Sequence, residues 1–175
     1  MNKPAGFKKV IEHFRSHQWS CREDPDAPIL RAGFRGDNAE FGAAVAVDES
    51  DTVVEVVGTV PIMAPPRKRA KVAELCAYLS WGMRMGRFEM DPADGEIRFH
   101  ASSAYPSGEL DDSVIRMVVG VALAMLDEHF PAFVRVIYGN VPPAEAALQI
   151  RERVCHRQKT APGPVLHLPA RLSLN

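Results

Sequence analysis

Apolar residues follow a helical spacing in two separate segments of the chain. Side chains at positions i, i+3, i+4 and i+7 lie on one face of a helix. This spacing occurs at Phe7, Val10, Ile11 and Phe14, and again at Val72, Leu75, Cys76 and Leu79. The pattern predicts one helix that ends near Trp19 and a second over residues 67–81, which follows Pro65 and Pro66.

Further helices are predicted in the second half of the chain. Asp111 can cap a third helix, which is expected to run to about Phe130 because Pro131 follows. Residues 132–138 (AFVRVIY) fit either a strand or a continuation of that helix. A last short helix is predicted over residues 144–154.

Three segments rich in β-branched residues lie between the first two helices: ILRAGF (29–34), EFGAAVAV (40–47) and TVVEVVGTVPI (52–62). Polar turn sequences separate them, so they are predicted to form three consecutive antiparallel strands after a turn-rich segment at 22–28. In the third segment, valines fall on both alternating faces. This predicts that both faces of that strand are buried.

The segment GRFEMDPADGEIRFHAS (86–102) is predicted to be a hairpin, because Pro92-Ala93-Asp94-Gly95 fits a four-residue loop. The loop sets a register that pairs Met90 with Ile97, Glu89 with Arg98, Phe88 with Phe99 and Arg87 with His100. Glu89 and Arg98 would then form a cross-strand pair of opposite charge on a solvated face. The charged residues are interpreted as sheet surface, and an acid/base or ligand site built from Glu89, Arg98 and His100 is the alternative.

Grouped strands and hairpin-length turns favour an α+β fold with a mainly antiparallel sheet packed by helices. The predicted order is α-β-β-β-α-β-β-α with an additional C-terminal helix. At 175 residues the chain fits one domain, placed at 1–156. Residues 157–175 form a tail with three prolines and no clear period, for which little fixed structure is predicted.

Several of these sequences resemble the YbjN-like domain, a family also described as a bacterial sensory transduction regulator. The resemblance rests on VAELCAYLSWGMRMGRFEMDPADGEIRFHAS, on LDEHFPAFVRVIYGNVPPAEA and on HQW after the first helix, and covers about residues 7–147. It implies the element order derived above and a fold similar to the type III secretion chaperones. It implies no catalytic residues.

Composition narrows the classes of function. The chain is 46% hydrophobic and 25% charged, as in soluble globular proteins, and its net charge of -1 provides no field that would gather nucleic acid or an anionic membrane. Three widely spaced cysteines offer no disulfide framework. The apolar run 114–126 is shorter than the roughly 20 residues of a membrane span. We therefore expect a cytoplasmic protein without membrane contact.

The sequence offers few residues for catalysis or ligand binding. The six histidines form no spaced ligand set and the glycines form no phosphate loop, so neither a metal nor a cofactor is expected. His129, near the end of the predicted third helix, is interpreted as a cation favoured by a helix C-terminus.

A basic stretch opens the second helix, with Arg67, Lys68, Arg69 and Lys71 on its first turns. Such runs are usually solvated, and no aromatic residues interleave as they would on a nucleic-acid surface. Cations are mildly unfavourable at a helix N-terminus, which suggests an acidic partner. Nucleic-acid association through residues 67–71 is the weaker alternative.

The third predicted helix is apolar almost all round, so it must be covered on more than one side. Val114, Val118, Val121 and Met125 mark the candidate surface. Either residues 144–175 cover it or a second subunit does. The leading hypothesis is a non-enzymatic, cytoplasmic, homodimeric binding protein, a regulator or chaperone-like module that holds a protein or peptide segment against an apolar groove.

Overall fold

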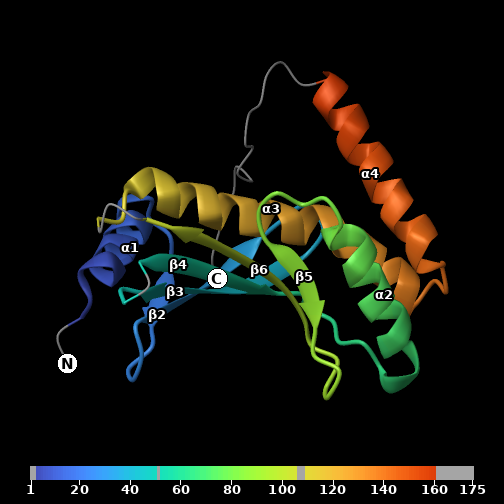
Figure 1. The fold of residues 1–175 in the computed structure, drawn as a ribbon, viewed down its shortest axis with the longest axis horizontal. Coiled ribbons are helices and arrows are strands. Elements are labelled where there is room, and N and C mark those ends of the chain that lie inside the picture. Colours follow the sequence, from blue (N-terminus) through green and yellow to red (C-terminus); the bar gives the residue numbers. More distant parts are fainter. Residues whose placement is uncertain (1–2, 51, 106–108, 161–175) are drawn as a thin grey trace.

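The computed structural model describes residues 3–50, 52–105 and 109–160, with side chains up to residue 153. The elements in chain order are α1 (Ala5–Ser16), β1 (Cys21–Glu23), β2 (Ile29–Arg35), β3 (Glu40–Asp48), β4 (Val53–Thr59), the 3₁₀ turn η1 (Pro66–Lys68), α2 (Arg69–Ser80), β5 (Arg87–Met90), β6 (Ile97–Ala104), α3 (Asp112–Ile137) and α4 (Pro143–Thr160). Figure 1 shows how they are arranged.

The six strands form one antiparallel sheet in the order β1-β2-β3-β4-β6-β5. This confirms the predicted α+β class and element order. Strand β1 was not predicted, because three residues at the start of the turn-rich segment are too few to show an alternating pattern. The first helix also ends earlier than predicted, at Ser16 instead of near Trp19.

The helices lie on one side of the sheet, with α3 running across it (Figure 1). Alternate strand residues point toward α3, and Val54, Val56, Ile97 and Phe99 are fully buried there. Helix α4 packs on α2 and α3 rather than on the strands. No described element covers the other face of the sheet.

The prediction that both faces of β4 are buried is therefore wrong. Val54 and Val56 are 0% exposed, but Val53 and Val57 lie on the uncovered face and are half-buried. A run of valines shows that a strand suits apolar surroundings, and does not show that a second layer of structure is present.

Helix α3 continues through Pro131 to Ile137, so the predicted end near Phe130 is wrong and the helical alternative for residues 132–138 holds. Proline has no amide hydrogen, which leaves the Asp127 carbonyl without its usual donor four residues later. Asn38 replaces that donor, because its Nδ2 lies 3.0 Å from the Asp127 carbonyl oxygen. The Asp127 carboxylate in turn accepts from the amides of Asp37 and Asn38.

Replacing Asn38 should weaken this support of the helix. We expect Asn38→Ala to lower the free energy of unfolding by about 1 kcal/mol, since it removes one exposed hydrogen bond to α3. Asp37→Ala is the matched control, because Asp37 contributes only its backbone amide, and it should change stability by less than about 0.5 kcal/mol. Urea unfolding measures both; equal effects would contradict the assigned role of the Asn38 side chain.

The hairpin forms in the predicted register, with all four pairs as expected. Gly95 has φ +90°, and a Cβ there would overlap the carbonyl oxygen of Ala64. The predicted Glu89–Arg98 ion pair is not the one that forms. Arg98 binds Glu96, just before the start of β6, with Nε at 2.8 Å, and Arg87 binds Glu89 at 3.2 Å.

The C-terminal helix is longer than predicted, because α4 runs from Pro143 to Thr160. Residues 157–160 of the predicted tail are therefore helical. The remainder of the tail, residues 161–175, lies outside the described residues.

Candidate functional site

The uncovered face of the sheet carries two transverse rows of residues on neighbouring strands. One row aligns Arg31, Ala44, Val57, His100 and Arg87, and the next aligns Gly33, Gly42, Thr59, Arg98 and Glu89. The positions on β3 and β4 are small in both rows, and the positions on β6 and β5 are polar or charged. This pattern leaves a hollow along β2, β3 and β4.

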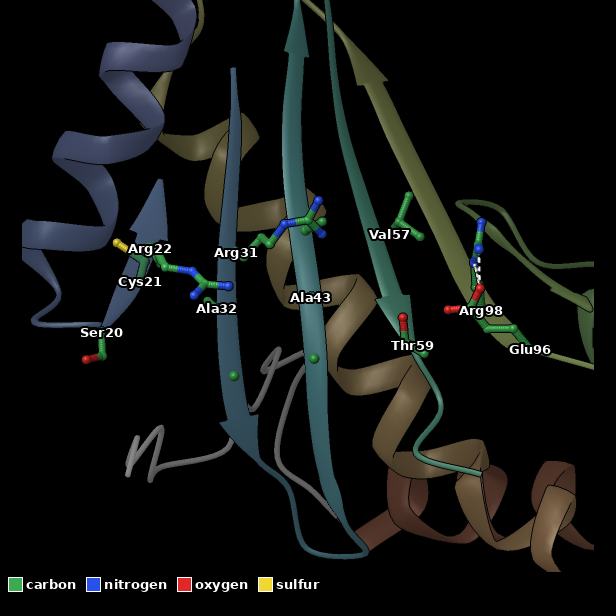
Figure 2. A pocket seen from close by; sticks show the side chains of 13 residues that line it. Ser20, Cys21, Arg22, Arg31, Ala32, Ala43, Val57, Thr59, Glu96 and Arg98 are labelled. Carbon is green, nitrogen blue, oxygen red and sulfur yellow. Dashed lines mark hydrogen bonds and ion pairs between the residues drawn. The ribbon is translucent and has the colours of Figure 1, made fainter. Parts of the chain in front are cut away.

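The hollow has a volume of about 670 Å³ and is shown in Figure 2, with α3 behind the strands. Small residues of the middle strands line its floor, among them Gly33, Gly42, Ala44 and Val57. A Cβ added to Gly42 would meet no atom within 4 Å. The floor is therefore close to backbone level, and side chains of a bound segment could reach it.

Arginines stand on both sides of the hollow. Arg22 and Arg31 rise from β1 and β2, while Arg98 rises from β6 (Figure 2). Arg31 lies 3.4 Å from Asp24, whose pKa is lowered first by a backbone hydrogen bond from Asp26 and then by Arg31. The Arg22 side chain makes no hydrogen bond or ion pair with the described residues. Its guanidinium is available to an external carboxylate.

Cys21 is among the residues that line the hollow, but its pairing with Ala32 places its thiol on the side of β1 that packs against the core. Burial, followed by the charge of Glu23, raises its pKa above the ordinary value of 9.0. The thiol is therefore protonated at neutral pH, and protonated thiols are poor nucleophiles. Cys76 is buried in the core, where burial raises its pKa to about 12.

The alternative constellation of Glu89, Arg98 and His100 does share this face, beside the hollow. Arg87 donates to His100 Nδ1 at 3.1 Å, which places the proton of the neutral ring on Nε2. Nε2 lies 3.7 Å from Glu55 and Nδ1 lies 4.0 Å from Glu89, both beyond hydrogen-bond distance. These residues form a polar cluster on a sheet surface and enclose no cleft.

The four basic residues of the second helix do not form one surface. Arg69 is committed to the hairpin loop, where it donates to the carbonyls of Pro92, Ala93 and Asp94 at 2.9 Å each. Lys68 is only 7% exposed. Only Arg67 and Lys71 face solvent. The predicted four-residue basic contact is thus reduced to two exposed cations and one buried one.

Arg69 should matter for stability because it joins α2 to the β5–β6 loop. We expect Arg69→Ala to lower the free energy of unfolding by about 1–2 kcal/mol, since several carbonyls lose a charged donor. Arg69→Lys should not restore stability, because an ammonium cannot reproduce the planar fork of donors. In urea unfolding, Arg67→Ala serves as the control and should differ from the wild-type protein by less than about 0.5 kcal/mol. A wild-type value for Arg69→Ala would refute the role.

The residues proposed for a subunit contact share one side of α3, but they differ in burial. Val118 is 0% exposed and belongs to the core, so the prediction that it forms part of a contact surface is wrong. Val114, Val121 and Met125 are partly buried, and Met117 beside them is 37% exposed. Helix α4 buries Ala146, Ala147 and Ile150 at the other end of the helix layer, which explains part of the apolar character of α3.

The homodimer stays a prediction, now placed on Val114, Met117, Val121 and Met125. Light scattering behind a sizing column should give a mass near twice the 19.3 kDa of the chain. Val121→Asp should halve that mass without unfolding the protein, because a charge is costly in an apolar contact. A monomer mass for the wild-type protein at all concentrations would contradict the predicted homodimer.

By length and composition, α3 could also cross a membrane, since it has 26 residues and an apolar sequence. The length argument made for residues 114–126 does not hold, because the helix continues beyond them. Half of the most apolar window of α3 is buried inside the protein, as in the core helix of a folded domain. The absence of membrane contact stays a prediction.

His129 is not a surface cation at a helix end, as its position before Pro131 had suggested. It lies inside the longer α3, is 7% exposed, and donates from Nδ1 to the Met125 carbonyl at 2.9 Å. Burial lowers its pKa from 6.5 to about 4, so the ring is neutral at pH 7.

Comparison with known proteins supplies the family. The sequence model of YbjN, described as "Putative bacterial sensory transduction regulator", matches residues 8–135. The chain belongs to the YbjN family. The resemblance inferred from the hairpin and the helix before it is thereby confirmed, although the piece Tyr138-Gly139-Asn140-Val141 lies beyond the matched range.

Among solved structures, the crystal structure of YbjN from E. coli, described as "a putative transcription regulator", is similar to this YbjN-family chain. The two are 11% identical with a TM-score of 0.45, over 86% of this chain and 92% of that one. No curated protein matches the sequence. The expected likeness to type III secretion chaperones stays a prediction.

The hollow was not predicted from the sequence, although the pattern of small residues on β2 and β3 indicates it. Gly33, Gly42 and Ala44 occupy the same alternating face of two adjacent strands, where exposed positions usually carry larger polar side chains. Only the pairing of β2 with β3 brings these small residues together.

Proposed function

We propose that this YbjN-family protein is a non-enzymatic cytoplasmic regulator that binds a segment of a partner protein in the hollow on the open face of its sheet. The segment is extended, carries small apolar side chains over Gly42 and Ala44, and has carboxylates near Arg22 and Arg31. The observation that carries the proposal is an uncovered sheet face whose middle is built from small residues, with Arg22 and Arg31 on one side and the Arg98–Glu96 ion pair on the other.

The composition of the hollow supports a polypeptide rather than a purely apolar ligand. Nine of the thirteen lining residues are small or apolar, and the four charged residues stand at the sides. Binding surfaces for proteins commonly combine an apolar middle with a polar rim, and arginine is enriched in them. The apolar groove expected from the sequence is thus replaced in the proposal by a mixed one.

Binding on the face is favoured over addition of a strand at the edge of the sheet. At one edge, Ser80 of α2 accepts from the Phe88 amide at 2.9 Å and donates to the Phe88 carbonyl at 3.3 Å, so β5 has little free edge. At the other edge, β1 has only three residues. Strand addition needs a longer row of free backbone groups.

The chemistry of the face supports a binding role over catalysis. Cys21 is held as a thiol, and neither Glu55 nor Glu89 reaches hydrogen-bond distance of His100. A general acid/base pair needs groups that converge on one reacting atom. The polar cluster around His100 is spread along a flat sheet instead.

The test fills the hollow without disturbing the core. Gly42→Trp places a large ring on the floor, where a Cβ meets no atom within 4 Å, so the variant should fold. Gly42→Ser is the matched control, because it changes the same position but leaves the hollow open. In affinity capture from cell extract with quantification by mass spectrometry, we expect the wild-type protein and Gly42→Ser to retain the same partner.

The expected result for Gly42→Trp is loss of that partner by about ten-fold or more, the size of effect produced by blocking the centre of an interface. Thermal melting of the three proteins checks that they are equally folded. Equal retention by all three would contradict binding at this hollow.

A further inference from the structure

A second cavity lies between the start of α2 and the C-terminal end of α3, which are neighbours in the fold (Figure 1). Its volume is about 470 Å³, within the range of small-molecule sites. It is lined by Arg67, Lys68, Lys71, Ile137, Tyr138 and Asn140. Three of these residues are cations and none is a carboxylate.

Lys68 is the residue that most requires explanation. It is 7% exposed, and its ammonium donates to the Val136 carbonyl at 3.1 Å and to Oδ1 of Asn140. Both acceptors are neutral, and Lys68 forms no ion pair with any described residue. An ammonium carries three protons, so one is left for a further acceptor. Buried lysines normally have an anionic partner, and no carboxylate of the described residues supplies one here.

The residues around Lys68 carry further positive charge and do not neutralise the charge of its ammonium group. Arg67 and Lys71 are exposed, and their side chains have no hydrogen bond or ion pair with the part of the chain described. The first turn of α2 holds no acidic residue, and the Lys68 side chain does not cap it. Cations at the positive end of a helix repel it, and a bound anion would remove that repulsion.

The remaining lining residues fit a flat ring next to the anion. Tyr138 is 66% exposed, which leaves its ring free to stack. Ile137 contributes an apolar wall beside it. An inorganic anion alone would leave most of 470 Å³ empty. Stacking of a base on an aromatic side chain contributes about 1–3 kcal/mol in nucleotide binding.

We infer that this cavity is a binding site for a mononucleotide. The phosphate lies against the free proton of Lys68 and between Arg67 and Lys71, and the base stacks on Tyr138. The site is separate from the hollow on the sheet, so the inference stands independently of the proposed protein partner. A mononucleotide fits better than a nucleic acid strand, because two exposed cations are too few to follow a phosphate backbone.

Isothermal titration of the full chain with adenosine 5′-monophosphate, inorganic phosphate and adenosine tests the site. We expect the monophosphate to bind more tightly than inorganic phosphate, and adenosine to bind least. The double variant Arg67→Ala/Lys71→Ala should weaken binding of the monophosphate by about ten-fold or more, since two charged contacts to phosphate are lost. Tyr138→Ala should weaken the monophosphate and leave inorganic phosphate unchanged.

Arg84→Ala is the matched control, because Arg84 is an exposed cation beyond the opposite end of α2. It should change the affinity by less than about two-fold. The inference is overturned if neither phosphate compound binds, or if Arg84→Ala weakens binding as much as the double variant. It is also overturned if a single-stranded oligonucleotide binds far more tightly through the same residues, which would indicate a nucleic-acid surface.

Discussion

The variant Gly58→Val should lower the free energy of unfolding by about 3 kcal/mol, the upper end of the cost of overpacking a core. Gly58 lies on β4 directly beneath α3. A Cβ there would overlap Cδ1 of Leu126 and lie 3.2 Å from its Cγ. Leu126 is 0% exposed and surrounded by packed side chains, so it cannot move aside without displacing others.

The neighbouring strand provides the matched control. Gly42→Val makes the same change on β3, but its side chain enters the hollow of the open face, where a Cβ meets no atom within 4 Å. Because valine suits a strand, stability should change by less than about 0.5 kcal/mol or rise slightly. Denaturant unfolding compares the two variants directly. Equal losses of stability in the two variants would contradict the conclusion that this face of the sheet is uncovered.

Acidification should destabilise the protein through His129. The folded-state pKa is about 4 and the ordinary value is 6.5, so the unfolded chain binds a proton more readily between these pH values. Stability therefore rises with pH through this window and is lost as the pH falls through it. The loss attributable to His129 is about 1 kcal/mol between pH 7 and 5.5, and about 3 kcal/mol between pH 7 and 4.

His129→Leu isolates this contribution, because the leucine occupies the same buried position and does not titrate. Asp24 and Asp111, whose pKa values are lowered by hydrogen bonds, are retained in both proteins, so their effects cancel in the comparison. Urea unfolding at pH 7, 5.5 and 4 should show a smaller loss for the variant. The same pH dependence in both proteins would show that His129 is not the cause.

The features of the fold that were predicted correctly are those that depend on the chemistry of neighbouring residues in the sequence. The hairpin register follows from Pro92 and Gly95, whose backbone preferences set the turn, and all four predicted pairs form. Pro131 shows the limit of this reasoning. Local chemistry predicts that the helix ends before this proline. The helix continues because Asn38, 89 residues away from Asp127 in the sequence, supplies the missing hydrogen-bond donor.

The candidate sites depended more strongly on tertiary structure. The four cations at 67–71 were visible as a group, but the fold decides that Arg69 binds a loop, that Lys68 is buried and that Arg67 and Lys71 remain free. The same holds for His129, whose charge state depends on burial by the continued helix. The hollow depends on the pairing of two strands, which no single segment encodes.

Site-specific photo-crosslinking in growing cells tests the central claim, binding of a protein segment in the hollow, most directly. A photoreactive amino acid replaces Ala44 on the floor of the hollow, and in a parallel strain it replaces Ala144, an exposed alanine on α4. We predict a discrete protein adduct from position 44, none from position 144, and loss of the adduct when Gly42→Trp is added. Identical products from both positions, or none from position 44, would contradict a binding site on the open face.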